Sequence, residues 1–214
     1  MTRTKSGIAS WGLWAVIAIS AVGVGVISLR YLSFDPELAP PELRPNLDAR
    51  PLFFYGHAVI ASLALLIGVW QFLPATRRGR YHRWAGRLYI VCVVPASIAG
   101  FIIALHTEMG PEAGVGFAIL AVLWLSATLM AYVRIRAKDY ASHRVWMIRS
   151  YALTCAAITL RIILPVGQMA GASFHDSYVI AAWGCWIINL AIAEWIIRKT
   201  KLKEIVPPVA SPVQ

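Results

Sequence analysis

Charged residues are scarce in this 214-residue sequence, and acidic residues are half as common as basic ones, at 10 against 20. Asp, Glu, Lys and Arg together make up 14% of the chain, against roughly 25% in an ordinary soluble domain. Hydrophobic residues make up 59%, and the mean hydropathy is +0.65. A chain with so little charge cannot cover a water-facing surface in the usual way, so its composition indicates an integral membrane protein.

Cysteine is also rare, and the motifs of several common enzyme classes are missing. The three cysteines, Cys92, Cys155 and Cys185, each lie in an apolar run and form no C-x-x-C pair, which argues against disulfides and against covalent haem attachment. The sequence has no G-x-x-x-x-G-K-[ST] loop, no H-E-x-x-H pair and no G-x-S-x-G turn. An ATPase, a zinc protease and a serine hydrolase are therefore not indicated. No apolar run holds a pair of carboxylates, which weakens the case for a proton-coupled transporter.

Long apolar runs are what the sequence has in abundance. A bilayer core requires about 20 apolar residues per helix, and six runs qualify. We expect an all-α membrane helix bundle with six transmembrane helices, forming a single transmembrane domain over residues 1–206, with a core four-helix bundle from spans two to five. The first run is longer than the core of a signal peptide, about 7–15 residues, so we interpret it as a retained span. The expected spans are about 8–30, 52–74, 85–106, 114–134, 146–168 and 177–198, with a proline-rich, irregular outer loop at 31–51 and a loose cytoplasmic tail at 199–214.

Basic residues gather in alternate loops, and the opposite loops hold most of the acids. Because Lys and Arg favour the cytoplasmic side, this pattern predicts a bacterial inner-membrane protein with both termini in the cytoplasm. The formal net charge of +10 does not indicate nucleic acid, because the basic residues lie in short loops where they contact the lipid bilayer. The basic positions are Arg3 and Lys5, then Arg77, Arg78, Arg80, Arg83 and Arg87, then Arg134, Arg136, Lys138 and Arg144, and finally Lys199, Lys201 and Lys203.

Histidine is the residue type whose pattern points to chemistry. The sequence has five, and they fall near the two faces of the predicted bundle. A b-type haem needs two axial imidazoles from facing helices, and its propionates need cationic partners. The pattern therefore predicts haem b with bis-histidine ligation and makes an electron-transfer protein the leading hypothesis. The candidate ligands are His82 and His143 inside and His57 outside, with His106 or His175 as its partner, and the candidate propionate partners are Arg87 and Arg161.

The fifth predicted span carries a polar stripe. His143 and Arg161 are separated by about five full turns of an ideal helix, so they point the same way, with Ser150 and Thr154 between them. A charge inside a span faces the bundle interior by default and indicates function. A structural pairing or a contact with lipid phosphate explains Arg161 equally well. Arg149 is expected to reach toward the interface.

Three segments resemble a known family. GHAVIASLALLIGVWQFLP (56–74), YHRWAGRLYIV (81–91) and HRVWMIRSYALTCAAITLRIILP (143–165) are similar to bacterial integral-membrane proteins grouped as a domain of unknown function. The resemblance covers roughly 52–168 and implies the fold without an activity. A looser similarity, to the four-helix di-haem cytochrome b and ferric-reductase bundles, implies haem near each face, although span four has no histidine. The matching positions are His57, Gln71, Phe72, His82, Arg83, Trp84, Gly86, Arg87, Tyr89, His143, Arg144, Trp146, Arg149, Tyr151 and Arg161.

Two other functions stay open on the sequence alone. Small-residue helix faces, such as Ala61, Ala64 and Gly68, and numerous Trp residues fit an accessory or assembly subunit of a membrane complex. A transporter of a small anion or a lipid would use an intramembrane arginine as its binding charge. The haem hypothesis implies a quinol or another membrane redox subunit as partner. Glu194 and Arg198, four residues apart, are expected to form a local ion pair.

Overall fold

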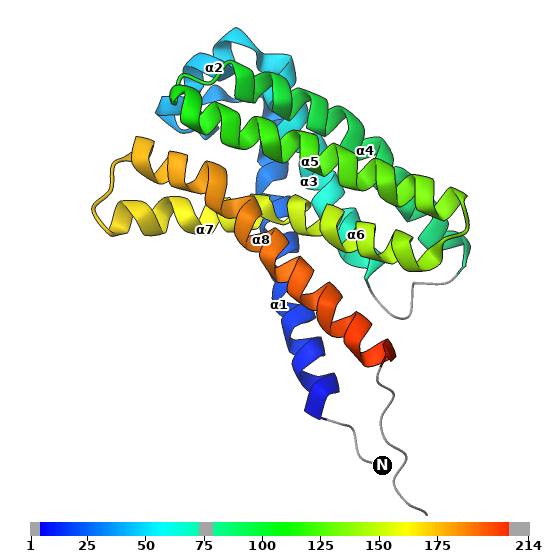
Figure 1. The fold of residues 1–214 in the computed structure, drawn as a ribbon. Helices are drawn as coiled ribbons and strands as arrows, with labels where there is room; N and C mark the ends of the chain where they lie inside the picture. The colour runs from blue at the N-terminus through cyan, green and yellow to red at the C-terminus, as the bar shows by residue number, and fades with distance from the viewer. Residues whose placement is uncertain (1–4, 73–78, 206–214) are drawn as a thin grey trace, which may run out of the picture.

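The computed structural model describes residues 5–72 and 79–205, and this part of the chain is helical, with no strand (Figure 1). Six of its segments are long and apolar enough to cross a membrane, which confirms the all-α, six-span prediction. Some of the basic residues on which the predicted orientation depends lie outside the described residues, namely Arg3, Arg77 and Arg78. The tail beyond residue 205 lies outside them too. The elements are α1 (Lys5–Ser28), η1 (Leu29–Ser33), η2 (Pro36–Leu38), η3 (Pro41–Leu43), α2 (Arg44–Ala49), α3 (Pro51–Gln71), α4 (Arg80–Leu105), α5 (Gly110–Arg136), α6 (Tyr140–Thr154), α7 (Ala156–Met169) and α8 (Phe174–Ile205), where η marks a 3₁₀ helix.

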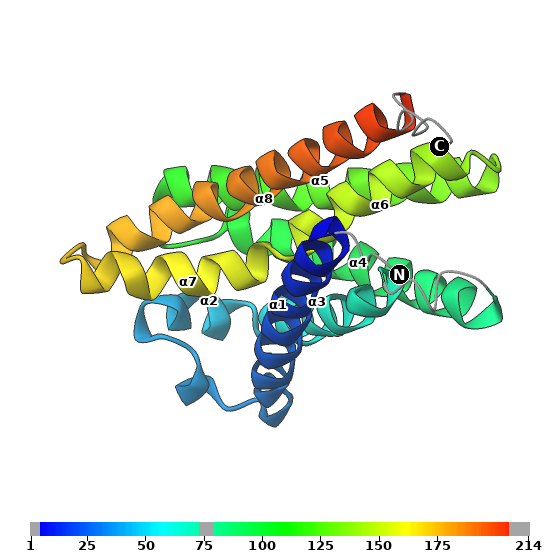
Figure 2. The ribbon, with the colours of Figure 1, turned by 90° about the horizontal axis from the view of Figure 1, so that it is seen from below.

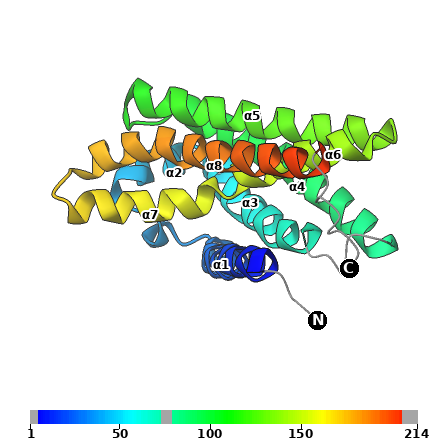
Figure 3. The same ribbon diagram turned by 60° about the horizontal axis from the view of Figure 1, so that its bottom comes forward.

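The helices α3, α4, α5 and α6 form the centre of the bundle, and α8 packs against α5, α6 and α7 (Figures 1 and 2). Helix α1 lies outside the bundle, contacts mainly α3, and crosses the other helices steeply instead of running beside them (Figures 1 and 3). We name the two ends of the bundle by what they carry. The loop end is capped by residues 29–50, and the basic end holds the start of α4, the end of α5 and the start of α6.

The segment predicted as an irregular loop is instead built from short helices. Prolines stand in the first turn of η2, η3 and α2. Proline is well tolerated there because its missing N–H would have no partner in the helix. Asp35 caps η2, where its carboxylate accepts a hydrogen bond from the Glu37 backbone N–H at 2.9 Å. The same prolines that prevent one long helix therefore start three short ones.

The predicted fifth span is broken into α6 and α7 at Cys155. Thr154 Oγ1 donates to the carbonyl one turn earlier, at Ser150, a bond that bends helices. Asn189 of α8 holds the two pieces together. Its amide donates to the Ala152 carbonyl at 3.0 Å, and its side-chain oxygen accepts from the Thr159 hydroxyl at 2.8 Å. The break is therefore stabilised by side chains from a neighbouring helix, which an apolar run cannot reveal.

Several helices run past the ends of the predicted spans. Helix α4 begins at Arg80, and α8 continues to Ile205, well into the segment expected to be a loose tail. The apolar run marks only the length that lies in lipid. Beyond the apolar run of α8, the sequence holds Lys, Leu and Glu, which are good helix formers, so the helix continues past that run.

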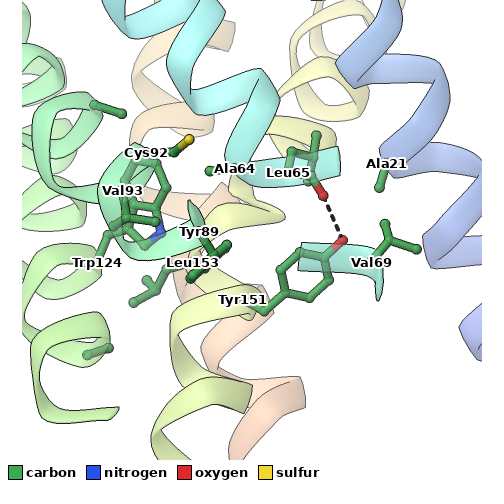
Figure 4. Packing of buried hydrophobic residues seen from close by; sticks show 12 residues of the cluster. Ala21, Ala64, Leu65, Val69, Tyr89, Cys92, Val93, Trp124, Tyr151 and Leu153 are labelled. Atoms are coloured by element: carbon green, nitrogen blue, oxygen red, sulfur yellow. Dashed lines mark hydrogen bonds between the residues drawn. The ribbon is translucent and has the colours of Figure 1, made fainter. Parts of the chain in front are cut away.

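The bundle core forms where α3, α4, α5 and α6 meet, and aromatic side chains fill the space left by small residues (Figure 4). On α3 the predicted small-residue face is buried at Ala64 and Gly68. The Tyr151 ring of α6 lies against Gly68, where a Cβ atom would collide with it. The Tyr151 hydroxyl donates to the Leu65 carbonyl at 3.2 Å. These contacts close the bundle between α3 and α6.

Candidate functional site

A buried hydrogen-bond network joins α4, α5 and α6 at the centre of the bundle. The Tyr89 hydroxyl lies 2.8 Å from Ser150 Oγ and 2.7 Å from Thr154 Oγ1. Trp124 Nε1 donates to Thr154 Oγ1 at 2.9 Å, and Thr128 Oγ1 lies 2.7 Å from Ser150 Oγ. All five side chains are buried. Polar groups inside a membrane protein must satisfy one another, so this network sets the relative heights and faces of the three helices.

The two candidate inner ligands both lie on the basic side of this network. His82 precedes Tyr89 by seven residues on α4, and His143 precedes Ser150 by seven residues on α6. Seven residues make about two helical turns, so each histidine shares a face with the network residue above it. Both helices begin at the basic end and run in the same direction. Both histidines therefore lie on the basic side of the Tyr89–Ser150 hydrogen bond, each about two turns from the residue of the network on its own helix.

The His143 ring is held by α5. Its Nδ1 lies 2.8 Å from the Ala131 carbonyl, and because a carbonyl only accepts, Nδ1 carries a proton and donates it in this contact. The start of α6 is fixed by Asp139, whose carboxylate accepts from the Ser142 backbone N–H at 3.0 Å. That hydrogen bond, followed by the Ser142 side chain and the Arg134 charge, holds the pKa of Asp139 below its usual value. The Nδ1 contact to the Ala131 carbonyl is of the kind that a metal-ligating histidine makes with its other ring nitrogen.

Arg134 supplies a cationic donor at the same end. It follows Ala131 by three residues, so it lies on the face of α5 that holds the His143 ring. One terminal nitrogen is 3.7 Å from the Asp139 carboxylate, while Nε is buried and has no hydrogen-bond partner in the described part of the chain. A buried N–H without an acceptor is costly, and a carboxylate would satisfy it. The sequence marks Arg134 only as a topology charge, because an orphaned atom is visible only in three dimensions.

Arg87, the predicted inner propionate partner, lies on another face of α4. It follows His82 by five residues, which places it about 140° around the helix. Its guanidinium lies over the Trp84 ring at 5.1 Å from the centroid, and both side chains are exposed. Arg87 therefore lies on a different face of α4 from His82, while Arg134 lies on the face of α5 that holds the His143 ring.

The outer histidines are not brought together. His57 lies between α3 and α4, with Nδ1 2.8 Å from the Ala96 carbonyl and its ring against Gly100. His106 is exposed and bonds to a carbonyl of its own helix, and His175 is exposed beside the neighbouring aspartate. No contact among the described residues joins His57 to either of them. Within the same residues, no group of three or more His, Cys, Asp or Glu side chains suits a metal ion.

Arg161 faces α1, so the predicted stripe is not continuous. Its guanidinium donates to Ser28 Oγ at 2.9 Å and to a carbonyl of its own helix. The α6 part of the stripe, at Ser150, faces α4 and α5 instead. The break at Cys155 separates the two parts. His143 and Arg161 therefore belong to different surroundings.

The family model described as a predicted membrane protein, DUF2306, matches residues 54–197. The chain belongs to this family. The DUF2306 match is longer than the resemblance over 52–168, because it also takes in most of α8. It includes both histidines of the basic end and the whole buried network. No curated protein and no solved structure matches the chain.

In this DUF2306 protein, α6 and α8 are joined by an ion pair that local sequence spacing does not predict. Arg149 Nε donates to Glu194 Oε1 at 2.6 Å, and a second nitrogen donates to Oε2 at 3.2 Å. The same guanidinium lies 4.6 Å from the centroid of the Trp146 ring. The sequence predicts Arg198 as the partner of Glu194, and the structure gives Glu194 the arginine of α6 instead. Arg149 thus joins α6 to α8, whereas the sequence predicts that its side chain extends toward the membrane surface.

Proposed function

We propose that this membrane protein binds one b-type haem at its basic end, which His82 and His143 would hold, and carries single electrons within the membrane. The observation that carries the proposal is the Tyr89–Ser150 hydrogen bond, from which both histidines are two turns away on facing helices. One tyrosine and one serine bridge the gap between α4 and α6. Two histidine side chains on the same two helices could therefore hold a group that lies between α4 and α6.

The donor set suits haem better than a bare metal ion. A protein-bound zinc site needs three or four side-chain ligands, and the described residues offer no such group. Haem iron takes four ligands from its own ring and needs only two imidazoles. The buried Nε of Arg134 is a ready donor to a propionate. When bound, haem supplies reversible one-electron chemistry.

The residues of the chain have distinct roles in this proposal. The Ala131 carbonyl orients the His143 imidazole. Asp139 fixes the first turn of α6 and thereby the height of His143. On the far side of the site, the network around Tyr89 and the apolar core beyond it exclude water from the middle of the bundle.

The partner and the location follow from the same proposal. A quinol or another redox subunit of the membrane would exchange electrons with the site. The protein would lie in a bacterial inner membrane with both termini, and hence its basic end, at the cytoplasm. The support is the arginine content of that end, because Lys and Arg concentrate on the cytoplasmic side.

The test is a visible spectrum of the full-length protein, expressed with haem supplied and purified in detergent. Oxidised and dithionite-reduced samples should show a Soret band that shifts on reduction. His82→Ala and His143→Ala should each remove the band. His106→Ala and His175→Ala are matched controls, exposed histidines at the other end, and should keep it.

Two results would overturn the haem proposal. One is a wild-type protein without a Soret band although haem was supplied, and the other is a band that survives both His82→Ala and His143→Ala. An accessory-subunit role gives a different pattern. Stoichiometric partner proteins would then co-purify, and the activity of their complex would survive both substitutions.

A further inference from the structure

A pocket opens at the loop end, between α1, α7, α8 and the segment from η1 to η3. Its volume is about 250 Å³. Most of its wall is apolar, including Leu160, Leu164 and Tyr178. Two arginines also line it, Arg30 from η1 and Arg161 from α7. An apolar pocket with two cationic groups is suited to a ligand that has an anionic head and an apolar body.

The two guanidinium groups are anchored but not neutralised. Arg161 donates to Ser28 Oγ at 2.9 Å, and Arg30 donates to the Leu38 carbonyl at 3.1 Å. Both acceptors are neutral oxygens. In the described part of the chain neither arginine belongs to an ion pair. Each guanidinium has five N–H donors, so both keep donors that an anion can use.

The depth of the pocket increases the need for an anion. Arg161 lies eight residues before the end of α7, which is about 12 Å along the helix, and inside the candidate span Tyr140–Met169. A charged group inside a span is costly and normally has a partner. An oxyanion between the two arginines would supply a counter-charge to both.

We propose that this pocket binds an anionic phospholipid. Its phosphate would lie between Arg30 and Arg161, in the bidentate manner that guanidinium groups favour, and its acyl chain would follow the apolar wall formed by Leu160 and Leu164. The described residues that line the pocket include no histidine. The lipid site is therefore independent of the haem proposal and would survive its failure.

The experiment titrates the full-length protein in detergent with three probes and counts bound molecules by native mass spectrometry. The probes are phosphatidylglycerol, phosphatidylcholine and inorganic phosphate. Phosphatidylglycerol should bind at least about tenfold more tightly than phosphatidylcholine, which is the effect of one charge-assisted interaction. Inorganic phosphate should bind far more weakly than the lipid, because it lacks the chain that the apolar wall contacts.

Substitutions locate the binding to this pocket. Arg30→Gln and Arg161→Gln should each weaken phosphatidylglycerol binding about tenfold, and Arg161→Lys should recover part of the loss because it restores the charge. Arg50→Gln removes the same charge at the same end of the bundle but outside the pocket lining, and should leave the affinity unchanged. Among the described residues, the Arg30 side chain bonds within its own loop. Arg30→Gln should therefore fold, and it tests the site even if Arg161→Gln fails to fold.

Three outcomes would overturn the lipid site. The first is equal wild-type affinity for phosphatidylglycerol and phosphatidylcholine. The second is unchanged phosphatidylglycerol binding in Arg30→Gln. The third is inorganic phosphate that binds as well as the lipid, which would show that the pocket takes a free anion and not a lipid.

Discussion

At Gly68 the lack of one carbon atom determines how two helices meet. The Tyr151 ring occupies the space where a side chain would begin, and from there its hydroxyl reaches the Leu65 carbonyl. Glycine is otherwise a poor helix residue, so its presence in the middle of α3 has a packing reason. The sequence shows the small residue, but it does not show which ring fills the space.

Gly68→Ala should therefore destabilise the protein. The added methyl group has to displace a buried aromatic ring, and overpacking of this kind costs about 1–3 kcal/mol. The matched control is Gly56→Ala on the same helix, where no atom lies within 4 Å of the added Cβ; it should be neutral or stabilise by up to about 1 kcal/mol. Thermal unfolding in detergent measures both. Equal effects of the two substitutions would contradict this packing.

At the scale of helices, the most important feature is the interruption between α6 and α7. It turns one predicted span into two shorter helices with different neighbours, so that Ser150 faces the bundle centre and Arg161 faces α1. A broken helix leaves backbone groups that must find partners inside the protein. Asn189 provides that partner from α8.

Asn189→Ala should loosen this junction. It removes the partner of the Ala152 carbonyl and of the Thr159 hydroxyl, at a cost of about 1–2 kcal/mol. Thr159→Val removes only one of the two bonds and should cost about half as much. Hydrogen exchange of the amides around residues 152–159 should speed up more in Asn189→Ala than in Thr159→Val. Unchanged exchange in Asn189→Ala would show that the amide does not hold the break.

At the scale of the whole molecule, the chain consists of a bundle and one outlying helix. The DUF2306 match begins in α3 and ends in α8, and this is the part that packs together as the bundle (Figure 1). The Arg149–Glu194 pair ties α8 to α6 within it. Helix α1 crosses outside, and Ser28 is its hydrogen-bond link to α7.

A double-mutant cycle measures the tie between α6 and α8. Arg149→Gln and Glu194→Gln should show a coupling free energy of about 1 kcal/mol, at the upper end of the range for partly exposed pairs, because the geometry is bidentate. The Arg44–Glu37 pair is the control. It makes one contact at 2.8 Å, and its glutamate side chain is 73% exposed, so its coupling should be below about 0.5 kcal/mol. Equal couplings would mean that the helix tie adds no more than a surface ion pair.

The sequence by itself determined the membrane fold, the number of spans and the small-residue face of α3, because each depends on the local run of apolar and small residues. It also singled out His82 and His143. Each precedes its network residue, Tyr89 or Ser150, by seven positions on one helix, so this spacing can be read from the sequence. Only the tertiary structure decided which residues pair: Arg149 with Glu194, and Asn189 with the broken helix. Only the tertiary structure also showed that Nε of Arg134 is buried without a partner in the described part of the chain. These depend on residues far apart in the chain, and the packing of whole helices sets which of them meet.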